Sequence, residues 1–180
     1  MANKIDIDKQ KAGRLINYGP VTLVTSSFKE QKNVATIAWA MPVSASPGLV
    51  AIAVTNKRFT YELIRESREF IINIPTQKMK DVVLFCGSTC GRELDKFSKT
   101  GLTPVDSKKL DTPIVEECFA HIECKVVNEA LVGDHMLFVG DVIAAYTDEG
   151  VMTAEDTIDI EKVQPLIHLG AKEFAGLKRV

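Results

Sequence analysis

The sequence has no feature that would carry it into a membrane or onto a nucleic acid. Its longest uninterrupted apolar run, residues 49–54, is far shorter than the roughly 20 residues needed to cross a bilayer. The formal net charge is −2, and Lys and Arg do not gather in the kind of basic block that binds a phosphate backbone. Residues 1–8 alternate charged and apolar side chains, so they lack the apolar centre of a signal peptide. These absences predict a cytoplasmic protein with no membrane or nucleic-acid partner.

Cysteine is scarce, and its spacing does not indicate a metal site. Cys86, Cys90, Cys118 and Cys124 are separated as C-x3-C and C-x5-C, not as the paired C-x2-C of zinc sites. Without an export signal these thiols are expected to stay reduced. We interpret each as a buried or half-buried side chain, with Cys90 distinguished by its polar, glycine-containing surroundings.

Histidine is also rare, and the familiar catalytic and nucleotide-binding motifs are missing. His121, His135 and His168 have no metal-like spacing, and no Ser-His-Asp arrangement can be proposed. Neither G-x-G-x-x-G nor G-x-x-x-x-G-K-[ST] occurs, which leaves a Rossmann or P-loop site unsupported. We therefore predict no metal site and no catalytic triad.

The pattern of apolar residues predicts one domain, residues 1–180, that is mainly β with peripheral helices. A chain of this length typically buries about 70% of its unfolded surface, so its core needs no disulfide. Runs rich in β-branched residues predict strands over 21–27, 33–39, 49–54, 70–74, 119–127 and 136–146. Helical spacing predicts helices over 8–18, 60–67, 77–86 and 95–100. Many strands with Greek-key-length connections favour a barrel with helices packed outside it.

A candidate phosphate site lies where the strand 49–54 runs through a loop into the next helix. A helix N-terminus offers free backbone N–H groups and a partial positive charge, and both favour a phosphate. Arg58 adds a bidentate donor and Thr60 a hydroxyl at this point. The alternative is structural, with Thr60 serving as the N-cap residue of the helix and Arg58 solvated.

A second candidate segment is 86–97, which places two glycines and two hydroxyl side chains between helices. Such a loop lets the backbone approach a ligand closely. Lys96 could then place a cation beside an electron-rich group. The alternative is an ordinary helix–loop–helix connection with a solvated lysine.

Trp39 is the single tryptophan and ends the predicted strand 33–39. On strand alternation it shares a face with Asn33 and Ile37, while Thr36 and Ala38 face the other way. The residues alone favour a place in the core or at an interface over a ligand platform.

Six segments, taken in order, resemble one known family. They are Pro20-Val-Thr-Leu-Val-Thr25; Asn33-Val-Ala-Thr-Ile-Ala-Trp39 with Val43-Ser44; Asn56-Lys-Arg-Phe-Thr60; Cys86-Gly-Ser-Thr-Cys-Gly-Arg-Glu-Leu-Asp-Lys-Phe97; Gly133-Asp-His-Met-Leu-Phe-Val-Gly-Asp141; and Pro165-Leu-Ile-His-Leu-Gly170. Together they resemble the flavin reductase-like, FMN-binding split-barrel family, of the flavoredoxin type, over nearly the whole chain. This resemblance implies a six-stranded Greek-key split barrel that forms a homodimer and binds FMN without a covalent bond.

The resemblance also implies where FMN would bind. Arg58 and Thr60 would hold the FMN phosphate, in agreement with the helix-terminus argument above. Trp39 would lie along the flavin ring and ribityl chain, and Lys96 near the N1/O2 edge of the ring. The cofactor-binding positions implied are Asn33, Thr36, Ala38, Trp39, Asn56, Arg58, Phe59, Thr60, Gly87, Ser88, Lys96 and His135.

The function implied by the resemblance is electron transfer through FMN. Electrons would come from NAD(P)H or a reduced protein and pass to a small acceptor such as free flavin or ferric iron. One alternative is an electron-transfer flavoprotein without an NAD(P)H site of its own. Others are a non-catalytic barrel that binds haem or stores flavin, and an activity like that of pyridoxamine-phosphate oxidase.

Overall fold

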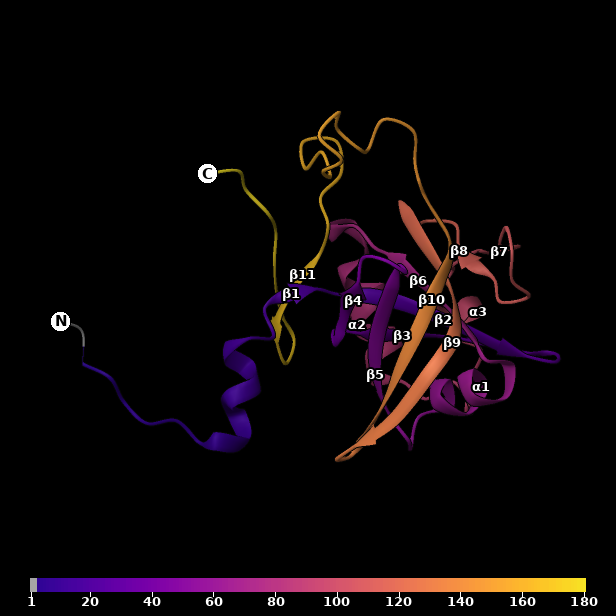
Figure 1. Ribbon diagram of the computed structural model, residues 1–180, viewed down its shortest axis with the longest axis horizontal. Helices are drawn as coiled ribbons and strands as arrows, with labels where there is room; N and C mark the ends of the chain where they lie inside the picture. Colours follow the sequence, from indigo (N-terminus) through magenta and orange to yellow (C-terminus); the bar gives the residue numbers. More distant parts are fainter. Residues whose placement is uncertain (1–2) are drawn as a thin grey trace.

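The fold is built on one antiparallel sheet that curls back on itself, as the computed structural model of residues 3–180 shows (Figure 1). Its strand order is β3-β2-β6-β9-β10-β5-β4. The two end strands, β3 and β4, follow each other directly in the chain, so the sheet must curl to bring them together. The strands are β2 (Thr22–Phe28), β3 (Gln31–Ile37), β4 (Ala40–Ser44), β5 (Leu49–Thr55), β6 (Glu69–Ile74), β9 (Ala120–Val132) and β10 (His135–Thr147).

The barrel stays open along one side. Among the pairings found in residues 3–180, β3 pairs only with β2, and β4 pairs only with β5. The chain crosses the open side at residues 38–39, where Ala53 N donates a 2.9 Å hydrogen bond to Trp39 O. One edge of β3 therefore keeps backbone N–H and C=O groups that no neighbouring strand uses.

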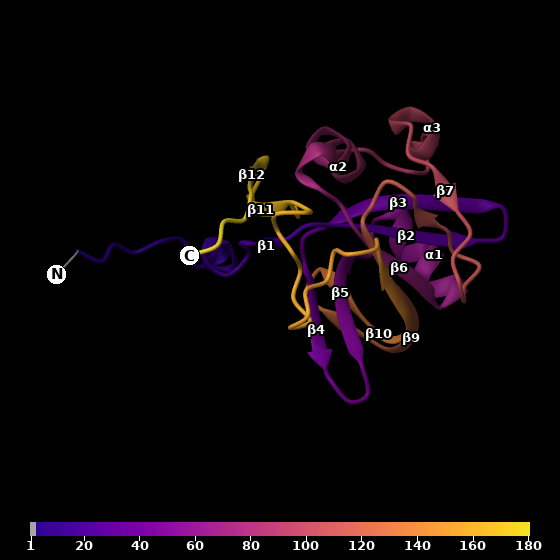
Figure 2. The ribbon, with the colours of Figure 1, turned by 90° about the horizontal axis from the view of Figure 1, so that it is seen from above.

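Two small sheets flank the barrel. The first joins β1 (Gly19–Pro20), β11 (Ile167–Gly170) and β12 (Glu173–Ala175). The second joins β7 (Pro104–Val105) and β8 (Ile114–Val115). The first sheet brings β11 and β12, near the end of the chain, beside β1, which follows the short helix η1 (Lys9–Leu15). From both directions of view the segment before β1 extends away from the barrel (Figures 1 and 2).

Helices cover the outside of the sheet, and the buried apolar side chains of the described residues form two large clusters and one small one. The helices are α1 (Phe59–Ser67), η2 (Gln77–Met79), α2 (Lys80–Ser88) and α3 (Lys96–Thr100). Strand β2 lies second from one end of the sheet, and its successive side chains, which point to opposite sides, are buried on both faces. Leu23 packs into the cluster that contains Val83 of α2, and Val24 packs into the cluster that contains Phe138 of β10.

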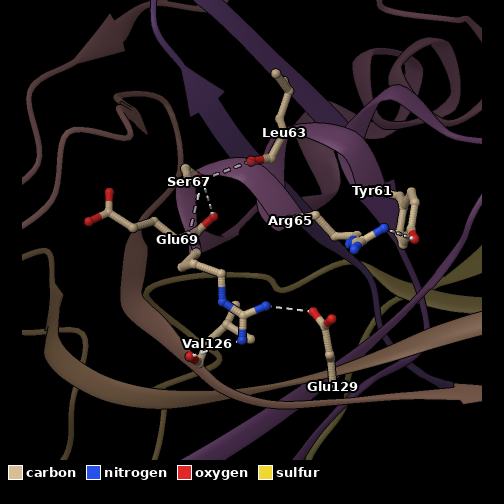
Figure 3. A network of polar contacts seen from close by, with 8 residues as sticks. Tyr61, Leu63, Arg65, Ser67, Glu69, Val126 and Glu129 are labelled. Atoms are coloured by element: carbon tan, nitrogen blue, oxygen red, sulfur yellow. Dashed lines mark hydrogen bonds and ion pairs between the residues drawn. The ribbon is translucent and has the colours of Figure 1, made fainter.

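Polar contacts fix the C-terminal end of α1 against the barrel (Figure 3). Arg68 ends the helix in the left-handed conformation, and its backbone N–H donates to Ile64 O. Its guanidinium lies 2.6 Å from a carboxylate oxygen of Glu129 on β9, and its carbonyl accepts from Val126 N. Because this end of α1 is tied to β9, the opposite end of the helix has a defined position on the barrel.

The mainly β split barrel and the predicted strands are confirmed, with three differences in detail. The curled sheet described in residues 3–180 has seven strands rather than six, because the bend at 38–39 separates β3 from β4. The helix predicted over 8–18 is a shorter 3₁₀ helix, η1. It buries none of its residues, so no packing stabilises a longer α-helix. Thr60 is not an N-cap, because α1 begins at Phe59 and Arg58 takes the cap position.

Candidate functional site

A pocket of about 410 Å³ opens beside the free edge of β3. Its size falls within the range of pockets that bind small molecules and cofactors. It lies between β3, the end of β5, the start of α1 and the end of α2, with η1 and β11 at its rim. The lining residues are Gln10, Gly13, Arg14, Asn17, Asn33, Ala35, Thr36, Ile37, Ala38, Trp39, Ala53, Val54, Thr55, Arg58, Phe59, Thr60, Cys86, Gly87, Cys90, Gly91, Lys96, His135 and His168.

The first wall of the pocket joins β3 to the N-terminus of α1. Asn33 is 3% exposed, and its Nδ2 donates a 2.8 Å hydrogen bond to the hydroxyl of the buried Thr60. Its other side-chain atom, Oδ1, is buried without a hydrogen-bond partner among residues 3–180. Gly91 approaches so closely that a Cβ there would overlap this oxygen. A buried acceptor without a partner is costly, so Oδ1 is suited to a donor supplied by a ligand.

The start of α1 supplies positive charge and N–H groups. The first-turn N–H groups of a helix have no acceptor within it, and they carry the positive end of the helix dipole. Arg58 precedes the helix in extended conformation and is exposed. Within residues 3–180 it forms no ion pair. This arrangement can hold a phosphate.

Lys96 brings a second cation to the pocket. It is 4% exposed, and its Nζ donates a 2.7 Å hydrogen bond to Cys86 O. Burial lowers the pKa of Lys96, and the nearby positive charge of Arg58 lowers it further. In the described part of the chain no carboxylate pairs with this ammonium group. A buried ammonium group with unused donors is suited to an anionic or electron-rich group of a ligand.

Trp39 and His135 form an aromatic wall. Their ring centroids are 4.7 Å apart, and Nδ1 of His135 lies 2.7 Å from Oδ1 of Asp134. Trp39 is 51% exposed, so of the two places that the residues alone favoured the core is excluded, and an interface stays a prediction. The reason for this exposure is its position at the bend where the chain crosses the open side of the barrel.

The end of α2 completes the pocket against β3. The hydroxyl of Thr36 donates a 2.5 Å hydrogen bond to Val83 O, and a Cβ at Gly87 would lie 3.2 Å from Cβ of Thr36. Cys86 is buried, and burial raises the pKa of its thiol to about 11. Cys90 is half-buried and also lines the pocket.

Ten of the twelve predicted site residues line this pocket. The exceptions among the described residues are Asn56, which is exposed, and Ser88, whose hydroxyl donates to Leu84 O in its own helix. Sequence reasoning missed Arg14 and His168 at the rim. His168 lies in the family-like segment 165–170 but was not assigned to the site, and no local motif marks Arg14, because both reach the pocket through pairing between distant parts of the chain.

Comparison with known families shows that the chain belongs to the flavin reductase-like family. The family's flavin reductase like domain matches residues 16–173. The protein YddH of Escherichia coli (strain K12) is 36% identical over 180 residues, covering 97% of this chain and 95% of YddH.

Two solved structures are similar throughout. The flavoredoxin of Methanosarcina acetivorans has a TM-score of 0.87 at 30% identity, covering 99% of this chain and 94% of that one. An FMN-binding protein of Thermus thermophilus, solved with bound 1-cyclohex-2-enone, has a TM-score of 0.85 at 25% identity, covering 98% and 96%. The family resemblance found in the sequence is confirmed, and these neighbours indicate a flavin cofactor.

Residues 3–180 contain no helix that combines the length and the apolar character of a membrane span. The same residues hold no group of three or more His, Cys, Asp or Glu side chains arranged to bind a metal.

Proposed function

We propose that this protein binds FMN without a covalent bond and moves electrons between a nucleotide or protein donor and a small acceptor. One pocket contains both the N-terminus of α1 with Arg58 and the edge of β3 that no strand of the described residues pairs with. This observation supports the proposal most strongly. The N-terminus of α1 can hold a phosphate, and the edge of β3 offers backbone donors and acceptors to a planar heterocycle. When bound, FMN supplies the hydride and single-electron chemistry.

The residues present fit the cofactor. Arg58, Thr60 and the first-turn N–H groups of α1 would hold the phosphate. Asn33 Oδ1, which has no partner in residues 3–180, accepts from a ligand hydroxyl or N–H. Trp39 and His135 would lie against the flavin ring. The pocket wall between the phosphate end and the ring end would be formed by Thr36, Ala38, Phe59 and Gly87.

Lys96 is proposed to shift the equilibrium between the oxidised and the reduced cofactor. Its ammonium group is buried and lacks a carboxylate in the described chain. The ring gains negative charge on reduction, so a nearby cation favours the reduced form. Lys96 thereby raises the reduction potential of the bound cofactor.

The reductase and the electron carrier are separated by one experiment. The FMN-loaded protein is mixed anaerobically with NADH or NADPH, and the visible absorption of the flavin is followed. Bleaching within seconds supports an NAD(P)H-dependent reductase. The high similarity to a flavoredoxin favours the electron carrier as second candidate, and a flavin that only a reduced protein or dithionite bleaches would assign that role. A protein that binds no flavin would reject both.

A homodimer is proposed from an exposed apolar face at one end of the barrel. This face lies between η1 and β4, where Ile16 is 85% exposed, Trp39 51% and Met41 56%. A hollow of about 500 Å³ on it is lined mainly by apolar side chains, including Pro20 and Leu137. Contiguous apolar surface of this kind marks an interaction site. A second copy of the chain fits it, since η1 buries no residue within its own chain.

The proposed cytoplasmic location is supported by the thiols. The four cysteines are unpaired, and Cys86, Cys118 and Cys124 are buried. Burial raises the pKa of all three thiols, to about 12 for Cys124. Such thiols are inert packing groups in a reducing compartment.

A further inference from the structure

The rim of the pocket carries two polar side chains that the proposed FMN contacts do not use. Arg14 of η1 and His168 of β11 both line the pocket. Strand β1 pairs with β11 so that Gly19 lies opposite His168, and η1 immediately precedes this pairing. The first small sheet therefore positions both side chains at the same rim.

This rim lies at the other end of β3 from Thr60. Gly13 of η1 and Asn17, which follows that helix, line the pocket together with Ala38, and they share the neighbouring apolar hollow with it. Thr60, in contrast, is bonded to Asn33. Five residues of extended chain separate Asn33 from Ala38, which is about 16 Å at 3.3 Å per residue. One phosphate bound at the first turn of α1 does not reach both places.

Both rim side chains have unused hydrogen-bonding capacity. Arg14 is exposed and forms no ion pair within residues 3–180. Its guanidinium lies against Gly170, where a Cβ would come within 2.7 Å of Nη1. Nδ1 of His168 is buried without a partner in the described chain, and Nε2 makes only a 3.3 Å contact to Ala171 O. The planar guanidinium of Arg14 suits a phosphate oxygen, and the tautomer of His168 that carries its proton on Nδ1 can donate a second hydrogen bond to it.

We propose that Arg14 and His168 form a second anion site, which binds a phosphate group of the nicotinamide dinucleotide that reduces the cofactor. The inference rests on the proposed function, because the second site has a role only when FMN occupies the first. Arg14 and His168 act as binding residues for the donor and not as catalytic residues. The pyrophosphate and the 2′-phosphate of NADPH share the chemistry that this site recognises.

The test compares Arg14→Gln with Lys11→Gln in the full chain. Lys11 lies on the same exposed helix but outside the pocket lining, so both variants remove one positive charge from η1. Anaerobic stopped-flow reduction gives the Kd for NADH and for NADPH, and calorimetry gives the Kd of ADP with and without FMN. We expect Arg14→Gln to raise these Kd values about tenfold, and Lys11→Gln less than twofold. His168→Gln is expected to raise them by a smaller factor, with the Kd of FMN unchanged in every variant.

The outcomes separate the two proposals. An equal loss with NADH and NADPH in Arg14→Gln assigns the site to the pyrophosphate, and a loss confined to NADPH assigns it to the 2′-phosphate. Equal affinities of Arg14→Gln and Lys11→Gln for all three ligands would overturn the second anion site while leaving the FMN site intact. If the wild-type chain binds no FMN, the proposed function is rejected. If Arg14→Gln then binds ADP as tightly as the wild type does, the second anion site is rejected separately.

Discussion

Asn33 on β3 and Thr60 on α1 are joined by a buried 2.8 Å hydrogen bond, although 27 residues separate them in the chain. The bond fixes the first turn of α1 against the free edge of β3. It also leaves Oδ1 of Asn33 facing the pocket without a partner in residues 3–180. One contact thus positions both the proposed phosphate site and a proposed acceptor for the ligand.

Removing the Thr60 hydroxyl tests this connection. Thr60→Val keeps the shape but leaves Asn33 Nδ2 buried without an acceptor, which costs about 1–3 kcal/mol of unfolding free energy. We expect urea unfolding to show this loss and the Kd of FMN to rise. Thr60→Ser, which keeps the hydroxyl, should stay close to wild type in both measurements. If Thr60→Val matched Thr60→Ser in FMN affinity, the hydroxyl would have no part in the site.

Lys96 is predicted to raise the reduction potential of the bound cofactor. Lys96→Met keeps the aliphatic length and removes the charge, so the potential measured by dye-equilibrated titration should fall. Lys99→Met, in the same helix but exposed, is the matched control and should leave the potential unchanged. An unchanged potential with a weakened FMN affinity would place Lys96 at the phosphate instead, beside Arg58.

His121 makes the stability of the fold depend on pH. Burial lowers its pKa, although the charges of Asp148 and Glu123 act in the opposite direction, and its Nδ1 lies 2.9 Å from Asn73 Oδ1. The unfolded chain therefore takes up a proton near pH 6.5 while the folded chain does not. Stability should be complete above that pH and decrease as the pH falls toward the lower, folded-state pKa.

Urea unfolding between pH 5 and 7.5 measures this effect. We expect His121→Gln to flatten the dependence of the unfolding free energy on pH. A wild-type slope in His121→Gln would show that other groups cause the acid sensitivity.

The exposed face around Met41 is predicted to be the interface of the proposed dimer. Met41→Glu places a charge in that face and should convert the dimer to a monomer in light scattering after size-exclusion chromatography. Val105→Glu introduces the same change on β7, which is not part of this face, and should leave the dimer intact. A wild-type chain that is monomeric at every concentration would contradict the proposed interface.

The strands and the α1 loop were predictable because their signals are local. β-branched runs predicted the strands that became β2, β3 and β5. Helical spacing predicted a helix over 95–100, which became α3, and the Asp95 side chain accepts from Phe97 N at its start. The prediction of a phosphate site at Arg58 also needed only the local order of strand, loop and helix.

Other features depended on distant parts of the chain. The exposure of Trp39 follows from the way the sheet curls, which strand alternation does not specify. His168 reaches the pocket through the pairing of β11 with β1, and Arg14 follows from the same contact. The short η1 reflects a lack of packing partners within the described chain, which its own periodicity does not reveal.

The most direct test of the central claim is the affinity for FMN compared with riboflavin, which lacks the phosphate. With about 31 non-hydrogen atoms at roughly 0.3 kcal/mol each, FMN should bind with a Kd on the order of 0.1–1 µM. In fluorescence titrations we predict that wild type and Lys57→Gln bind riboflavin at least about tenfold more weakly than FMN, and that Arg58→Gln loses most of this difference. Equal affinities for the two flavins in the wild type, or a difference that survives in Arg58→Gln, would contradict a phosphate site at the start of α1.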